Sequence, residues 1–265
     1  MSTEVLQGAP RAAIPTASHE RYAVVATTLG VVALLQIASM VAPPYIAPPP
    51  LDILESLWTK LLPLYPDMLL TLARLAVSLG CAMVLGTILG LAMGMLPAAR
   101  PYLRSLVVID TGIPALSWML IAVFWFRMPE ARIFFILVVI VIPFYALGVA
   151  DAIRAMPKDL LEMCESFRPS RLQVLRYLIF PHILPYIFAT TRSVIGYATR
   201  MIIFAELIAA TAGIGAKMGV AQANFDISLI LAWTVLLVVL NTVLQQAITL
   251  IEKQLLGYRP AIEVR

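Results

Sequence analysis

The residues of this chain that could do chemistry are charged side chains set among long apolar stretches. Nine of its 34 charged residues (19 basic and 15 acidic) lie between Asp151 and His182. Three more, Asp110, Arg200 and Glu206, stand inside apolar stretches. A charged segment in water can bind a polar partner, whereas a charge at membrane depth usually faces the protein interior or a water-filled path. The two groups therefore predict a docking segment and a polar region within an apolar body.

Composition places the body of the chain in a membrane. The 265 residues are 61% hydrophobic and 13% charged, with a mean hydropathy of +0.92. A helix needs about 20 apolar residues to cross the hydrocarbon core, and four uncharged runs supply roughly that many. These runs are Tyr22–Leu51, Leu75–Ala99, Ile133–Ala150 and Ile227–Ile251. Because lipid offers no hydrogen bonds to the backbone, the runs predict an all-α integral membrane protein.

Proline and charge positions divide the chain into about six membrane helices. We expect them at 22–41, 68–95, 102–126, 132–150, 184–210 and 228–251. The prolines before residue 51 end the first helix, and a short amphipathic helix over Leu51–Leu62 is expected along the membrane surface. Residues 1–21 are expected to form a disordered cytoplasmic tail, and residues 22–265 are expected to form a single transmembrane domain.

Lysine and arginine residues indicate the orientation of the chain. With the amino terminus inside, the cytoplasmic segments hold twelve of them and the opposite side holds four. This asymmetry fits the positive-inside rule. Both termini and the charged segment are therefore predicted on the cytoplasmic side.

Three glycines, Gly86, Gly90 and Gly94, recur at four-residue spacing on the second predicted helix. Small residues stacked on one face let two helix backbones approach closely in lipid. Packing within the chain is the favoured interpretation, and an interface between subunits is the alternative.

The charged segment is expected to form two amphipathic helices joined at Arg168-Pro169. Apolar residues recur at spacings of three and four on both sides of this junction. Pro169 suits the first turn of the second helix, where its missing N–H has no partner to lose. Arg168 should end the first helix, because a residue before proline avoids helical geometry. A solvated loop on the membrane is the alternative, but length and double amphipathicity favour a docking element.

The residues of this segment resemble a known family. The runs Pro157-Lys-Asp-Leu-Leu-Glu-Met-Cys164, Arg168-Pro-Ser-Arg171 and Leu178-Ile-Phe-Pro181-His-Ile-Leu-Pro185 are similar to the cytoplasmic "EAA" loop of permease subunits from binding-protein-dependent ABC importers. Further motifs agree in order and spacing, most of all with the nitrate, sulfonate and taurine branch. They are Thr71-Leu-Ala-Arg74, Arg192, Ala205-Glu206-Leu207 and Gly213-Ile-Gly215.

This resemblance implies the fold and the mechanism. It implies a type I ABC importer permease fold, in which a coupling hairpin at 157–182 inserts into a groove on a separate ATP-binding subunit. Closure of two such subunits would swing the membrane helices between inward and outward access. The residues implied to contact the ATPase are Glu162, Cys164, Glu165, Arg168, Pro169, Ser170 and Arg171.

The resemblance also implies the partners and the location. The partners are two ATPase subunits, a second copy of this permease, an extracytoplasmic substrate-binding protein and membrane lipid, in the bacterial cytoplasmic (inner) membrane. The chain has no G-x-x-x-x-G-K-[ST] sequence, so ATP and Mg are expected on the partner and no cofactor on this chain. No nucleic-acid partner is expected, because the chain has no basic patch interleaved with aromatic residues.

Two departures from the family pattern fall in the loop. Met163 and Cys164 replace two alanines, and Arg168 replaces the usual glycine. Glycine permits a tight reversal with positive φ, which an arginine before proline should not adopt readily. We therefore expect a different angle between the two helices, or a different contact with the partner.

Seven residues within the predicted spans are candidates for the translocation path and its gate. They are Asp110, Pro114, Trp118, Met119, Arg192, Arg200 and Glu206. Pro114 could break its helix and form a gate, while ordinary packing is favoured for Trp118 and Met119. Recurrence in the family implies a shared structural or gating role for Arg192 and Glu206.

Arg200 replaces a residue that is commonly apolar in the family. At about 1.5 Å per residue from Pro185, it should lie past the middle of the bilayer. We weigh two interpretations equally: Arg200 attracts an anion in the path, or it pairs with Asp110 or Glu206. The first interpretation predicts a small anionic or organic solute as the transported molecule.

Two other functions were considered. An ion-coupled secondary transporter is the alternative, but such proteins usually show internal repeats, and this chain shows no convincing one. A membrane-embedded enzyme is less well supported, because the sequence has no H-E-x-x-H, no Cys/His metal spacing and no Ser/His/Asp set. The sequence therefore predicts a transport subunit and no catalytic or metal site.

Overall fold

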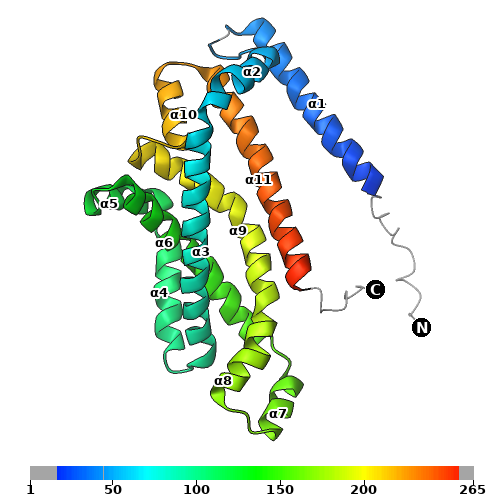
Figure 1. Ribbon diagram of the computed structural model, residues 1–265, viewed down its shortest axis with the longest axis vertical. Coiled ribbons are helices and arrows are strands. Elements are labelled where there is room, and N and C mark those ends of the chain that lie inside the picture. Colours follow the sequence, from blue (N-terminus) through cyan, green and yellow to red (C-terminus); the bar gives the residue numbers. More distant parts are fainter. Residues whose placement is uncertain (1–16, 44, 257–265) are drawn as a thin grey trace, which may run out of the picture.

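The computed structural model describes residues 17–43 and 45–256, and within them the chain is helical with no strand (Figure 1). The helices of the first half are α1 (Ala17–Val41), α2 (Pro50–Ser56), η1 (Leu57–Leu61), η2 (Leu62–Leu64), α3 (Tyr65–Met95), α4 (Arg100–Gly112), α5 (Ala115–Trp125) and α6 (Pro129–Arg154). The helices of the second half are α7 (Lys158–Ser166), α8 (Arg171–Gln173), η3 (Val174–Ile179), α9 (Phe180–Ala209), α10 (Ile214–Ala223) and α11 (Ile227–Leu255). The predicted all-α fold is confirmed.

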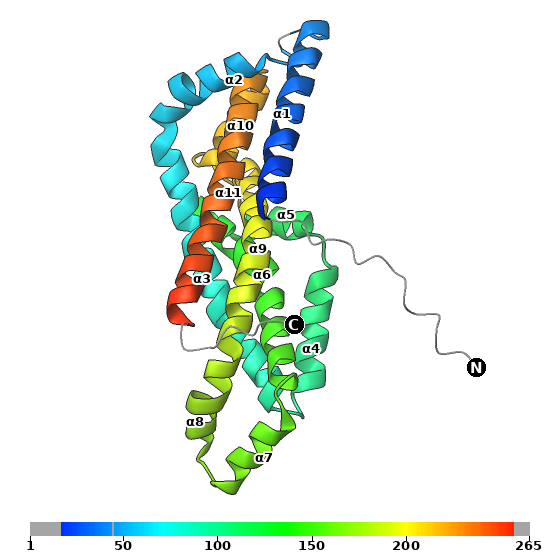
Figure 2. The same ribbon diagram turned by 90° about the vertical axis from the view of Figure 1, so that its right-hand side faces the viewer.

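The long helices are apolar enough to span a membrane. In the described part of the chain, five helical stretches meet this condition, and a bent pair formed by α4 and α5 brings the number to six. This number agrees with the six spans predicted from the sequence. Four of the long helices, α3, α6, α9 and α11, run along the long axis of the molecule (Figures 1 and 2).

The core forms where α3 and α6 pack along their lengths, and glycines make this possible. A Cβ atom added to Gly86 would lie 2.6 Å from the Cβ atom of Tyr145, and one added to Gly90 would lie 2.7 Å from the carbonyl oxygen of Ala146. Only glycine allows such close backbone contact. These glycines therefore allow two helices of the same chain to pack closely, as predicted.

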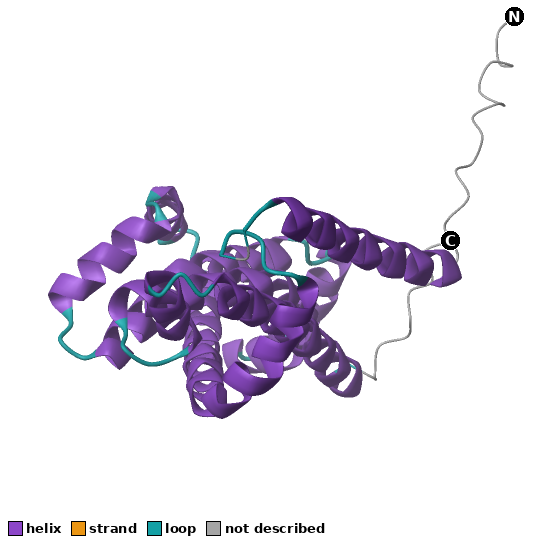
Figure 3. Cartoon of the chain, turned by 90° about the horizontal axis from the view of Figure 1, so that it is seen from above, coloured by secondary structure: helices purple, strands orange, loops and turns teal. Residues whose placement is uncertain are grey.

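Helix α1 lies outside this bundle. None of the span Tyr22–Val41 is buried within the described part of the chain. Figure 3 shows the helix that leads to the N-terminal trace on the periphery of the molecule. Of the predicted tail 1–21, residues 1–16 lie outside the described residues, and α1 begins at Ala17 rather than at 22.

One ion pair joins α11 to the segment that follows α2. The ammonium nitrogen of Lys60 lies 2.6 Å from a carboxylate oxygen of Asp226, which also accepts a hydrogen bond from the backbone N–H of Leu229. Burial alone would raise the pKa of Asp226, but these two donors outweigh it and hold the pKa below its ordinary value. Both side chains remain partly exposed, so the pair contributes little to stability.

The third predicted span is not one helix. It is broken between α4 and α5, which meet at an angle of 94°. Pro114 cannot donate a backbone hydrogen bond, and Ile113 before it adopts an extended conformation with ψ of 123°. The single helix predicted at 102–126 was therefore wrong, while the break expected at Pro114 is present.

The second helix of the charged segment is also not separate. Residues from Arg171 to Ala209 run continuously through α8, η3 and α9, so the helix start predicted at 184 was wrong. The π-helical turns of η3 immediately precede Pro181. Membrane helices tolerate proline when the local helical geometry changes so that the freed backbone groups find other partners. Helix α10, short and adjacent to α9 and α11, was not predicted.

Candidate functional site

The charged segment forms a hairpin at one end of the molecule. Helices α7 and α8 lie beyond the nearby ends of α3, α4 and α11 (Figures 1 and 2). The side chain of Glu162 is exposed and that of Cys164 is half-buried, whereas the side chain of Glu165 lies outside the described part. Arg168, Ser170 and Arg171 are exposed, and Pro169 is half-buried. The hairpin therefore presents polar side chains away from the apolar bundle.

A capping box starts the second arm of the hairpin. The hydroxyl oxygen of Ser170 accepts a hydrogen bond of 3.3 Å from the backbone N–H of Gln173, and the side-chain oxygen of Gln173 accepts one of 2.7 Å from the backbone N–H of Ser170. Each bond satisfies an N–H group that the helix itself leaves free. Pro169 thus lies before the N-cap residue Ser170. The prediction that Pro169 belongs to the first helical turn was wrong.

The junction contradicts one prediction made from the sequence. Arg168 adopts a φ of 47°, although it precedes proline. The reversal for which the resemblance implied a glycine is therefore made here with arginine. Left-handed geometry costs an L-residue with a side chain about 1–2 kcal/mol, so this junction stores strain.

Replacing Arg168 with glycine should relieve this strain and stabilise the hairpin by about 1 kcal/mol. Amide hydrogen exchange across α7 and α8 measures the stability of the hairpin, because local opening becomes rarer as that stability increases. We expect slower exchange in Arg168→Gly and no change in Arg127→Gly, which alters an exposed arginine outside the hairpin. Faster exchange in Arg168→Gly would contradict the strain argument.

A buried ion cluster joins three motifs that are far apart in the sequence. A guanidinium nitrogen of Arg74 lies 2.8 Å from a carboxylate oxygen of Glu206, whose side chain is fully buried. The hydroxyl of Thr71 lies 2.9 Å from both oxygens of this carboxylate. The second terminal nitrogen of Arg74 binds Glu130 at 3.0 Å. The cluster therefore connects α3, α6 and α9.

The same cluster binds the start of α10. The backbone N–H of Gly213 donates to Asp67, that of Ile214 to Thr71, and that of Gly215 to Glu206, at 2.8, 2.9 and 3.0 Å. These groups have no partner inside α10, and a carboxylate near a helix N-terminus is further stabilised by the helix dipole. Glu206 thus acts as a structural anchor for α10 in this conformation.

Gly213 is required at the entrance to α10. Its φ of 110° lies in a region that residues with a Cβ atom rarely adopt. A Cβ atom at this position would also collide with the carboxylate of Glu206. The sequence contained all the motifs of this cluster, but nothing in their spacing indicated that Arg74 and Glu206 would pair.

Arg192 pairs with a residue that the sequence did not single out. Its guanidinium lies 2.9 Å from a carboxylate oxygen of Glu252 on α11. This ion pair joins α9 to α11 on the hairpin side of the residues that line the groove described next. Glu252 lies near the end of a long apolar helix, where the sequence offered no specific signal for its partner.

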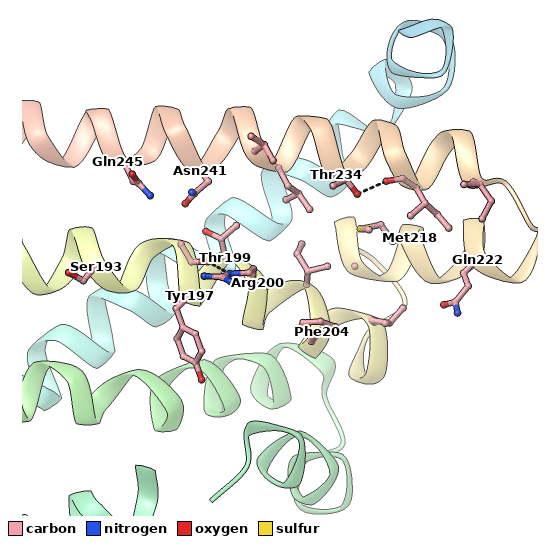
Figure 4. Close-up of a pocket in the computed structure, with 18 residues that line it drawn as sticks. Ser193, Tyr197, Thr199, Arg200, Phe204, Met218, Gln222, Thr234, Asn241 and Gln245 are labelled. Atoms are coloured by element: carbon pink, nitrogen blue, oxygen red, sulfur yellow. Dashed lines mark hydrogen bonds between the residues drawn. The ribbon is translucent and has the colours of Figure 1, made fainter. Parts of the chain in front are cut away.

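A groove of about 920 Å³ lies between α9, α10 and α11, and Arg200 is exposed in it (Figure 4). The Nε of Arg200 donates to the carbonyl oxygen of Gly196 at 3.1 Å, one turn earlier in the same helix. Among the described residues Arg200 forms no ion pair, so it pairs with neither Asp110 nor Glu206. Polar side chains that share the groove are Ser193, Gln222, Thr234, Asn241 and Gln245.

The remaining path candidates lie at the break between α4 and α5. Asp110 and Trp118 line a small cavity there, Pro114 forms the N-cap of α5, and Met119 is buried in the core. The packing favoured for Met119 is therefore what the structure shows. The seven candidates do not form one site but occupy five places: this cavity and its hinge, the core, the groove, the buried cluster and the α9–α11 ion pair.

Comparison with known proteins agrees with this architecture. A family model described as "Binding-protein-dependent transport system inner membrane component" matches residues 82–257. The chain is 27% identical to the taurine transport system permease protein TauC of Escherichia coli over 256 residues, which cover 94% of this chain and 91% of the relative. It is 25% identical to the nitrate import permease protein NrtB of Synechococcus elongatus over 149 residues, 56% of this chain and 53% of the relative.

A solved structure shows the same fold. The MetNI methionine ABC transporter in an inward facing conformation matches with a TM-score of 0.59 at 22% identity, covering 72% of this chain and 95% of that chain. The helical bundle and the hairpin therefore have the fold of a type I ABC importer permease. The chain belongs to the family of binding-protein-dependent transport system inner membrane components. An ion-coupled secondary transporter is not favoured.

Proposed function

We propose that two copies of this chain form the translocation path of an importer for a small anionic or organic solute. Two separate ATPase subunits bind ATP and Mg, and this chain holds no cofactor. An extracytoplasmic binding protein delivers the solute, and the membrane helices alternate between inward and outward access. The relatives named for taurine and nitrate transport support this class of solute.

One observation carries the coupling role. The hairpin of α7 and α8 projects past the apolar bundle with exposed charged residues on it, and it is continuous with α9, which lines the groove (Figure 1). A force applied to the hairpin is therefore transmitted directly to the helix that carries Arg200. The contacts to the ATPase would come from Glu162, Cys164, Glu165 and the turn from Arg168 to Arg171. We therefore expect the hairpin and both termini on the cytoplasmic side.

Reversing the charge of Glu162 tests this role. In Glu162→Lys, we expect the ATPase that co-purifies with the membrane-extracted permease to fall severalfold, because an ion pair at a docking interface would become a repulsion. Glu55→Lys, an exposed glutamate on α2 at the other end of the molecule, is the matched control and should leave the yield unchanged. Equal ATPase recovery with both variants would refute the proposed contact.

Arg200 carries the proposal for the solute. Within membrane spans an exposed arginine without a carboxylate partner is costly unless it faces water or an anion. The groove provides such a place, with the amide side chains of Asn241 and Gln245 on the facing helix α11 (Figure 4). This arrangement supports an anionic group on the transported molecule.

Replacing Arg200 with leucine should abolish most uptake without dissociating the complex. We would measure ATP-dependent uptake of taurine, ethanesulfonate and nitrate by the assembled transporter in vesicles, and expect about a tenfold loss for each transported anion, since about 1.4 kcal/mol of attraction corresponds to a factor of ten. Arg200→Lys should retain part of the uptake, because the positive charge remains. Undiminished uptake by Arg200→Leu would remove this residue from the path.

A further inference from the structure

A second polar cavity lies beside the groove, at the break between α4 and α5. It has a volume of about 90 Å³, and its walls include Asp110 from α4, Trp118 from α5, Phe144 from α6 and Tyr197 from α9. A single water needs roughly 10–15 Å³ of such space. The cavity can therefore hold a compact polar group, although not a large solute.

Asp110 supplies this cavity with a negative charge that has no counterion. The side chain is half-buried, and no lysine, arginine or histidine within the described residues lies within ion-pair distance of it. The buried indole N–H of Trp118 lies near this carboxylate, to which it is a weak hydrogen-bond donor and not a counterion. A carboxylate left unpaired in a membrane span marks a functional site by default, because its burial is costly.

Part of the remaining wall is aromatic, and this part favours a cation. Three of the lining side chains carry aromatic rings, and the ring centroids of Phe144 and Tyr197 are 5.5 Å apart. Aromatic faces attract ammonium groups through their quadrupoles, and cages of such rings are used to bind methylated ammonium ions. A carboxylate among three aromatic rings combines charge attraction with this preference.

We propose that Asp110, Trp118, Phe144 and Tyr197 form a binding site for an ammonium or methylated ammonium group. The fit rests on the unpaired carboxylate, the aromatic walls and the small volume, and it does not depend on the family of the chain. An anion would be repelled by Asp110, and a hydrated metal ion would find one carboxylate where it needs several oxygen ligands.

The location of this site suggests which solute it serves. Tyr197 lines both the cavity and the groove of Arg200, and its side chain extends from α9 toward α6, away from α11 (Figure 4). A solute with both charges would thus meet a guanidinium on one side of Tyr197 and a carboxylate on the other. The transported class would then be a small zwitterion, a conclusion that rests on the proposed role of Arg200, whereas the ammonium site itself does not.

Methylammonium binding tests the site directly. The assembled transporter in lipid nanodiscs would be titrated with methylammonium chloride while tryptophan fluorescence is recorded, since Trp118 is one of only four tryptophans in the chain. We expect a saturable change that sodium chloride does not produce. Trp118→Phe should lose the optical change, and Asp110→Asn should weaken binding by about tenfold or more.

Asp52→Asn, an exposed aspartate on α2, is the matched control and should bind like the unaltered protein. The melting temperature of each variant shows whether it is folded. No saturable response, an equal response to sodium chloride, or unchanged affinity in folded Asp110→Asn would each overturn the proposal.

A second titration separates this proposal from the proposed function. Taurine carries a sulfonate and an ammonium group, whereas ethanesulfonate lacks the ammonium. Asp110→Asn should weaken binding of taurine and leave that of ethanesulfonate unchanged, while Arg200→Leu should weaken both. If Arg200→Leu has no effect but methylammonium still needs Asp110, the role of Arg200 fails and the ammonium site stands.

Discussion

Replacing Arg74 with methionine is expected to destabilise the protein by about 3–5 kcal/mol, because it leaves the buried carboxylate of Glu206 without its counterion. Methionine preserves much of the length and apolar volume of the arginine stem, so packing changes little. The loss should appear as a large fall in melting temperature of the protein in nanodiscs. It should also loosen the start of α10, where the backbone N–H of Gly215 donates to the same carboxylate.

The pair can be separated from its surroundings by a double-mutant cycle. Glu206→Leu alone leaves Arg74 buried beside Glu130, and the double variant Arg74→Met with Glu206→Leu removes both charges. Replacing both members of a buried ion pair is often nearly neutral, whereas breaking it is strongly destabilising. We therefore expect the double variant to melt at a higher temperature than Arg74→Met.

An exposed ion pair provides the matched control. Lys60→Met breaks the contact with Asp226, but both side chains are partly exposed and the effect should be below about 1 kcal/mol. If Arg74→Met and Lys60→Met melt at similar temperatures, burial does not set the strength of the Arg74–Glu206 pair. If the double variant is the least stable of all, the attraction between Arg74 and Glu206 stabilises the fold by more than the desolvation of the two charges costs.

The spans were predictable because long apolar runs leave the chain few choices. A backbone in lipid must satisfy its own hydrogen bonds, so uncharged runs of sufficient length become helices. The break near Pro114 was predictable for a similar local reason, since proline removes a donor and restricts the residue before it. What local rules do not give is the angle of 94° that follows the break.

The buried cluster could not be derived from the sequence alone. The motifs around Arg74 and Glu206 were visible, but which charge pairs with which depends on how α3, α9 and α10 pack. The sequence likewise left open whether Arg200 pairs with Asp110 or Glu206, and in the structure Arg74 is the arginine that pairs with Glu206. That Arg200 lies in a groove and forms no ion pair with a described residue follows from how α9, α10 and α11 pack, which the sequence does not give.

The conformation of Arg168 shows the limit of residue preferences. Pre-proline and side-chain rules both disfavour a positive φ there, yet the chain reverses with φ of 47°. The capping box at Ser170 and the long helix that follows fix one arm of the hairpin, and α7 fixes the other. A local cost of about 1–2 kcal/mol is outweighed when the elements on both sides over-determine the turn.

The opposite responses of two glycines on α3 give the sharpest test of the core. Gly90→Ala should destabilise the protein by about 1–3 kcal/mol, because overpacking forces the helices apart. The added methyl group would lie 2.7 Å from both the carbonyl oxygen of Ala146 and the Cβ atom of Val149. Backbone and a β-branched side chain on α6 have little freedom to move away.

Gly80→Ala is the matched change on the same helix, where a Cβ atom would meet nothing within 4 Å. It should stabilise the protein by about 0.5–1 kcal/mol, since alanine loses less backbone entropy than glycine in a helix interior. Melting temperatures in nanodiscs should therefore move in opposite directions for the two variants. A shared direction would mean that helix propensity, rather than the contact between α3 and α6, decides the outcome, and the close-packed seam would lose its physical basis.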